Sequence, residues 1–233
     1  MNKFVIFAPV RGFFYFLISP RLWVRPIVAT LIGSLLLGFV FWIFTWHFWP
    51  PDFIKSWEYF WHSIKAVGIA AVITTFVWVF IMPFFFGFAF EGVIKKTLVK
   101  EDLATDKESS FVSSMFAGFY LMIKTIGWRL FWPFLTLLVL FFFPILTPFV
   151  GALGMGHTAV MDGAGITLAY YGLETKEQVA YIKKHSGKFL WMGLVGGLVF
   201  FILLPMLFIW LFWIPGIFVG TALWIGEHLK GNK

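Results

Sequence analysis

Two arginines stand close together at the start of the first long apolar segment. Arg21 and Arg25 are four residues apart, a spacing that would place both side chains on one face of a helix. A guanidinium is a fork of N–H donors that can hold an oxyanion bidentately, and Arg11 offers the same group further upstream. These residues predict a binding site for a tetrahedral inorganic anion. The alternative is a set of topology-setting charges that extend to the lipid headgroups.

Three more ionisable residues lie in or beside apolar segments, namely Glu91, His157 and Asp162. An ionisable group at membrane depth is a functional candidate, so these residues predict a pore or a coupling site, with His157 and Asp162 as proton carriers. The alternatives are an interfacial position for His157 and Asp162, and a local pair of Glu91 with Lys95 one turn along a helix.

The remaining motifs indicate packing rather than catalysis. Gly151, Gly154 and Gly156 would allow helices to approach closely or would present backbone amides to an anion. The chain has no cysteine, and it has no GxSxG, HExxH or phosphate-loop motif. We therefore predict neither an enzyme nor a cofactor or metal site.

The composition is that of a membrane protein. Hydrophobic residues make up 61% of the chain and charged residues only 12%, a balance that water-soluble domains do not show. The 33 Phe and 13 Trp residues are typical of lipid-facing surfaces and interfacial belts. The net charge is +7, and the basic residues that give it lie in short segments between apolar runs. This position favours contacts with anionic lipid over contacts with nucleic acid.

The elements that must position the candidate residues follow from the charge-free runs. Residues 26–49 and 66–90 each have the length of one membrane-crossing helix. Residues 130–161 and 189–226 are longer and contain prolines; as one helix, the second would be roughly 57 Å long, against about 30 Å of hydrocarbon. Because proline kinks or ends a helix, we expect two membrane-inserted helical hairpins, either re-entrant with half-membrane pieces or fully spanning.

The basic residues favour this topology. If both hairpins return to the side they enter, sixteen of the eighteen Lys and Arg residues share one face, and only Lys55 and Lys65 lie opposite. The positive-inside rule makes the first face cytoplasmic, with both chain termini on it. Surface helices are expected at residues 3–23, 112–126 and 175–188. The sequence thus predicts one all-α integral-membrane domain over residues 1–233.

Several segments carry a resemblance to a known family. The opening helix of that family is similar to residues 8–20, APVRGFFYFLISP. A family segment that closes in Glu is similar to residues 82–91, MPFFFGFAFE. The C-terminal third of the family is similar to residues 170–194, YYGLETKEQVAYIKKHSGKFLWMGL, and to residues 214–224, IPGIFVGTALW. In this order these segments resemble the CysZ-type sulfate permeases, the bacterial branch of the etoposide-induced protein family. The resemblance implies two transmembrane helices, two hemi-penetrating hairpins, and a homo-oligomer in the bacterial inner membrane.

Residues 20–25 depart from that family. Its members carry a Gly-apolar-Arg-Arg-like run associated with sulfate, whereas this chain reads PRLWVR. The expected function is passage of a small inorganic anion, sulfate or a relative, between the hairpins, where half-helix N-termini direct partial positive charge inward. The alternative is a non-transporting scaffold or tether that binds anionic lipid or a protein partner. Buried polar groups between the hairpins would favour the permease, and a tightly packed apolar interface would favour the scaffold.

Overall fold

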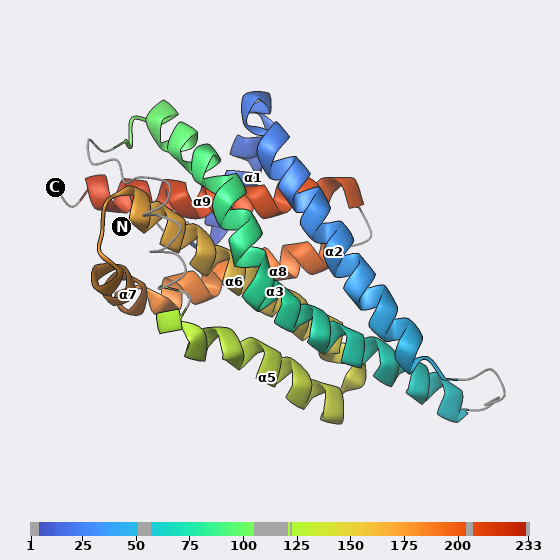
Figure 1. Ribbon diagram of the computed structural model, residues 1–233. Helices are drawn as coiled ribbons and strands as arrows, with labels where there is room; N and C mark the ends of the chain where they lie inside the picture. Colours follow the sequence, from blue (N-terminus) through green and yellow to red (C-terminus); the bar gives the residue numbers. More distant parts are fainter. Residues whose placement is uncertain (1–4, 51–56, 105–120, 122, 204–206, 232–233) are drawn as a thin grey trace.

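The computed structural model describes residues 5–50, 57–104, 121, 123–203 and 207–231, which form helices joined by short turns (Figure 1). No strand occurs among these residues. Four of the described helical segments are long and apolar enough to cross a membrane: Val24–Phe48, Trp57–Ile81, Pro144–Tyr170 and Ser186–Leu203. The protein is therefore an all-α membrane protein, which confirms the predicted fold class.

Helices α2 (Val24–Phe48) and α3 (Trp57–Lys100) pack side by side and run in opposite directions (Figure 1). Pro26 lies in the first turn of α2, where its missing N–H costs nothing. Most of the α2 surface is exposed and apolar, with Leu35 66% and Trp42 59% exposed, so α2 faces lipid. Helix α3 has 44 residues and is about 66 Å long. It therefore contains the predicted span and continues beyond it as the polar segment that ends at Lys100.

Both expected hairpins are present. The first consists of α5 (Ile126–Phe142), the short helix η3 (Pro144–Leu146) and α6 (Thr147–Tyr170), and the second of α8 (Ser186–Leu203) and α9 (Leu207–Lys230). The second helix of each hairpin returns toward the end where the first began (Figure 1). The hairpins thus extend several residues beyond the predicted limits of 130–161 and 189–226.

Neither Pro133 nor Pro215 divides its helix into half-membrane pieces, and Pro205 lies outside the described residues. Pro133 lies inside α5 and Pro215 inside α9, so these helices are about 25 and 36 Å long. The sequence predicted that each of these prolines kinks or ends a helix, and the expectation that Pro215 ends one was wrong, because α9 continues through it. Neighbouring helices can supply donors to the carbonyls that a membrane proline leaves without a partner. Pro144 and Pro148 do mark the turn, since Pro144 begins η3 and Pro148 lies in the first turn of α6.

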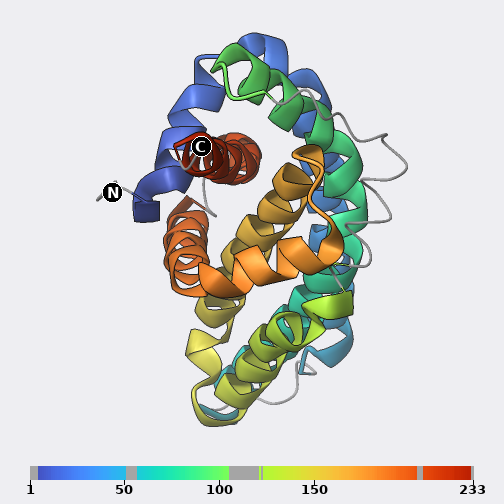
Figure 2. The ribbon, with the colours of Figure 1, turned by 90° about the vertical axis from the view of Figure 1, so that its left-hand side faces the viewer.

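The N-terminal helix α1 (Ala8–Leu17) packs against α9, and Figure 2 shows it beside α9, which is seen nearly end-on. A Cβ atom on Gly12 would overlap backbone atoms of Gly216 and Gly220, so the two backbones touch. The spacing of Gly216 and Gly220 is that of the GxxxG motif of membrane helix pairs. The opposite face of α1 remains exposed, with Phe14 58% exposed. Helix α1 is thus shorter than the predicted 3–23 and is docked on the bundle.

Helices α6 and α8 pack just as closely. A Cβ atom on Gly156 would overlap the backbone at Gly193 and Gly197, and a Cβ atom on Gly197 would overlap that of Ala152 and Leu153. The sequence left open whether the glycines of residues 151–156 serve close packing or anion binding. In the structure Gly156 lies at a contact between helix backbones.

One end of the bundle brings together four distant parts of the chain. Lys230 near the C-terminus pairs with Asp102 in the turn after α3, at 2.9 Å, and the Tyr171 hydroxyl after α6 donates to the carbonyl of Leu103. Helix α7 (Thr175–Lys184) begins with a capping box and connects α6 to α8 at this end (Figures 1 and 2). Most of the predicted 112–126 helix lies outside the described residues.

Candidate functional site

The most unusual polar feature is a buried ion pair between two helices of the first hairpin. Arg129 lies in the first turn of α5, and its Nη2 donates to Oδ1 of Asp162 on α6. The two side chains are only 4% and 9% exposed. Buried charges carry a desolvation cost of several kcal/mol per ion unless they are paired and hydrogen-bonded, so the fold must hold this pair by further contacts.

Two of those contacts come from α3 and from the turn before α5. Arg129 Nη1 lies 3.4 Å from the carbonyl oxygen of Val79, and Nε lies 3.3 Å from Thr125 Oγ1. Residue 83 is proline, so the backbone of α3 has no N–H to donate to Val79. Arg129 supplies the missing donor. Among the described residues these bonds use three of the five guanidinium N–H groups.

The pair lies deep in the apolar part of the molecule. Val79 is 14 residues after Lys65 and 12 residues before Glu91, and no charged residue lies between them. Along α3 these separations correspond to about 21 and 18 Å, which places Val79 near the middle of a membrane-length segment. Placing an ionisable residue at such a depth costs free energy, and residues of this kind typically mark substrate or ion pathways.

His157 extends the cluster by hydrogen bonding to Trp132. The indole Nε1 of Trp132 on α5 donates to Nδ1 of His157 on α6 over 2.8 Å, and His157 is 3% exposed. An indole N–H can only donate, so Nδ1 must be the acceptor and the ring proton resides on Nε2. The backbone of His157 lies against Gly193 of α8. His157 therefore lies where the two hairpins meet.

Buried threonines continue the polar character along α3, α5 and α6. The hydroxyls of four of them donate to the carbonyl four residues earlier in the same helix, which leaves their oxygen lone pairs available: Thr75, Thr136, Thr158 and Thr167. Three other buried hydroxyls on these helices, those of Thr74, Thr97 and Thr147, have no hydrogen-bond partner among the described residues. A hydroxyl both donates and accepts, so this interface can exchange hydrogen bonds with a polar solute.

Only two of the predicted site residues, His157 and Asp162, belong to this cluster. Arg21 lies in the short helix η2 (Pro20–Leu22) and Arg25 in α2, and both are exposed. The expectation that they share one helical face was wrong, because the chain leaves the η2 helix before α2 begins. The guanidinium of Arg25 reaches α3 beside Gly92.

The other two predicted residues also lie away from the cluster. Arg11 on α1 pairs with Glu227 on α9 at 2.6 Å. Glu91 lies on α3, partly buried, at the boundary between the apolar segment and the polar extension.

Arg129 was missed by the sequence reasoning, which counted it among the surface charges before residue 130. A signal was present: Arg129, Trp132, Pro133 and Thr136 recur at steps of three and four and form the buried face of α5. In a membrane helix, the polar face is the one that turns toward protein.

No protein-family model, curated protein or solved structure matches the chain. The site must therefore be interpreted from its own geometry.

Proposed function

We propose that this membrane protein is a permease for a small inorganic oxyanion of the sulfate type. The observation that carries the proposal is the Arg129–Asp162 pair, a cation held near the middle of an apolar segment with two N–H groups that bond to no residue in the described part of the chain. A fixed guanidinium in a site of low dielectric binds an oxyanion far more strongly than it would in water.

Asp162 gives the site a way to release what it binds. The carboxylate competes with an incoming anion for Arg129, so the anion binds when the pair opens and leaves when the pair re-forms. His157 carries its ring proton on Nε2 and can donate one hydrogen bond to the anion. Because the chain has no nucleotide-binding motif, flux follows a gradient or the membrane potential.

The peripheral arginines fit the same proposal as a collecting surface. Arg21 and Arg25 are exposed, and Arg25 lies beside Gly92, near the polar extension of α3. Both attract anions toward the cytoplasmic end of the bundle. The resemblance of residues 8–20, 82–91, 170–194 and 214–224 to the CysZ-type permeases supports the same substrate class and a location in a bacterial inner membrane, with both termini cytoplasmic.

The test is uptake of radiolabelled sulfate into proteoliposomes, with the purified protein and a variant that carries Arg129→Gln and Asp162→Asn together. The double change removes both charges but keeps two amides that can hydrogen-bond, so no unpaired charge is left buried. We expect uptake by the wild type and background uptake by the double variant, with both proteins monodisperse. Uptake by the variant at the wild-type rate would refute the role of the pair.

The matched control neutralises an ion pair of the same charge at the surface. Asp102→Asn with Lys230→Gln removes the exposed pair at the end of the bundle, and uptake should be unchanged. An Arg21→Gln, Arg25→Gln variant should raise the sulfate concentration needed for half-maximal uptake and leave the maximal rate nearly intact.

A second candidate function is a non-transporting scaffold or tether. The observation that favours it is the contact between the hairpins at Gly156, Gly193 and Gly197, where the backbones of α6 and α8 touch and leave no room for a solute. A scaffold would bind anionic vesicles through its basic residues but would carry no flux. Binding without uptake of sulfate, phosphate or any other tested oxyanion by the wild type would favour this function.

A further inference from the structure

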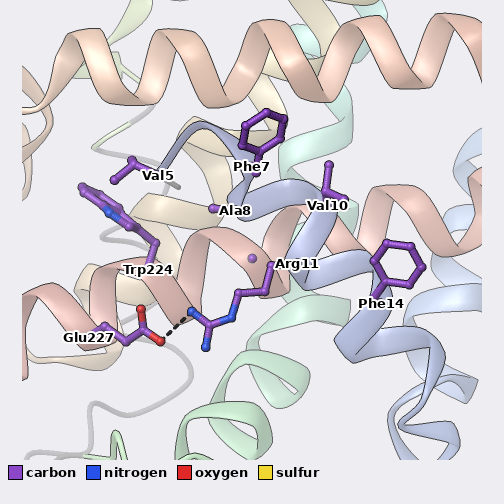
Figure 3. Close-up of a pocket in the computed structure, with 9 residues that line it drawn as sticks. Val5, Phe7, Ala8, Val10, Arg11, Phe14, Trp224 and Glu227 are labelled. Carbon is purple, nitrogen blue, oxygen red and sulfur yellow. Dashed lines mark ion pairs between the residues drawn. The ribbon is translucent and has the colours of Figure 1, made fainter. Parts of the chain in front are cut away.

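A groove lies between the N-terminal helix and the end of α9, away from the buried ion pair. Its volume is about 610 Å³, and its walls include Val5, Phe7, Phe14 and Trp224 (Figure 3). This volume is within the range of about 300–1,000 Å³ that small-molecule sites occupy. The groove is therefore large enough for part of a lipid.

The shape of the groove is fixed by packing. Its floor is the contact between Ala8 and Gly220, where a Cβ atom on Gly220 would overlap the Ala8 carbonyl. The Trp224 ring is 7% exposed, stacks on His228 at 5.5 Å between centroids, and meets the edge of Phe189 at 5.4 Å. Because neither the floor nor this wall can move without breaking close contacts, the groove is preformed.

One ion pair lies at the edge of the groove. Arg11 on α1 and Glu227 on α9 are joined across it at 2.6 Å, and their side chains are 53% and 34% exposed (Figure 3). An exposed pair of this kind contributes little to stability. It does present a cation and an anion side by side, both available to a ligand.

The outer surface of α1 shows what surrounds the groove. Phe7, Phe14 and Ile18 are 47%, 58% and 75% exposed, and in a membrane protein such side chains face lipid. Tryptophan and arginine are residue types that lie at the headgroup level, as Trp224 and Arg11 would here, and Glu227 is paired with Arg11. The groove thus has an apolar part that opens among lipid tails and a zwitterionic edge at headgroup depth.

We propose that this groove binds a phosphatidylethanolamine-type lipid, with an acyl chain in the groove, the phosphate at Arg11 and the primary ammonium at Glu227. The charges decide among lipid classes. An anionic lipid would meet repulsion from Glu227. A choline lipid has a quaternary ammonium with no N–H to donate, so it loses the charge-assisted hydrogen bond that a primary ammonium makes.

This proposal does not depend on anion transport, because none of its residues belongs to the Arg129–Asp162 cluster. The test uses the full chain in micelles that contain equal amounts of ethanolamine, choline and glycerol phospholipids with identical acyl chains. Native mass spectrometry then counts the bound lipids. We expect the ethanolamine lipid to exceed the choline lipid roughly tenfold, the ratio that one charge-assisted hydrogen bond gives.

Three variants separate the parts of the site. Glu227→Gln should bring the ethanolamine-to-choline ratio close to one, and Arg11→Gln should weaken binding of both lipids. Val10 also lines the groove, and Val10→Trp should fill it and reduce all phospholipid binding. Lys183→Gln changes an exposed cation on α7 and should alter nothing. Size-exclusion chromatography confirms that each variant is folded.

Two results would overturn the proposal. The first is a wild-type protein that retains the choline or glycerol lipid at least as well as the ethanolamine lipid. The second is a folded Glu227→Gln variant that keeps the full preference for ethanolamine, since the ammonium would then be bound elsewhere.

Discussion

Replacing Asp162 with asparagine should destabilise the protein strongly. The change leaves Arg129 charged and 4% exposed without its counter-ion. Removing one partner of a buried ion pair costs about 3–5 kcal/mol. Arg129 keeps its contacts with Val79 and Thr125 at 3.4 and 3.3 Å, so we expect the lower part of that range.

The magnitude translates into a clear thermal shift. For chains of 150–250 residues, each kcal/mol lowers Tm by about 2–4 °C, so 3 kcal/mol corresponds to roughly 6–12 °C. The 13 tryptophans allow unfolding in detergent micelles to be followed by intrinsic fluorescence. Adding Arg129→Gln to Asp162→Asn should recover most of the loss, because no charge then remains buried.

The surface pair provides the control for this measurement. Asp102→Asn breaks a contact with Lys230 in which the Asp102 side chain is 99% exposed, and Tm should change within error. An Asp162→Asn variant within about 2 °C of the wild type, less than 1 kcal/mol by the same conversion, would refute the reasoning. A double variant destabilised by the sum of its two single changes would refute it as well.

Three further predictions concern packing, pH and topology. Gly197→Ala should lower Tm because the added Cβ atom overlaps the α6 backbone. Gly38→Ala should leave Tm unchanged, since a Cβ atom there has no neighbour within 4 Å, and equal effects of the two changes would contradict the α6–α8 contact. Burial lowers the pKa of His185 below its ordinary 6.5; the hydrogen bond to the Tyr181 carbonyl opposes this shift, and the charges of Lys188 and Lys184 add to it. Below about pH 6.5 the unfolded chain therefore binds more protons than the folded one, so stability falls as the pH falls. A His185→Gln variant should show a shallower decrease between pH 7 and 5, and an unchanged slope would contradict it. A single cysteine at Lys183 should react with impermeant reagent only from the cytoplasmic side, and periplasmic labelling would overturn the topology.

Much of the fold could be predicted because membrane insertion imposes strong local rules. Charge-free length located the spans of α2 and α3, since a backbone in hydrocarbon must be helical. Length together with the prolines and the distribution of the basic residues predicted the two hairpins. Element ends were less accurate: the hairpins begin and end several residues beyond the charge-free runs, and α9 continues through Pro215. Whether a proline ends a helix depends on donors from neighbouring helices, and these are not encoded within the segment.

The candidate site could likewise be predicted from the sequence only in part. The sequence marked Asp162 and His157 as unusual, because ionisable residues in apolar runs are rare. It could not show that Arg129, 33 residues before Asp162 in the chain, is its partner, or that Val79 offers the carbonyl that Pro83 leaves without a donor. Arg129 stands at the edge of a charged segment, where a surface position and a buried one look alike. Only the packing of α5 against α3 and α6 decides that Arg129 is buried. Burial of a charge depends on partners that the tertiary fold brings together.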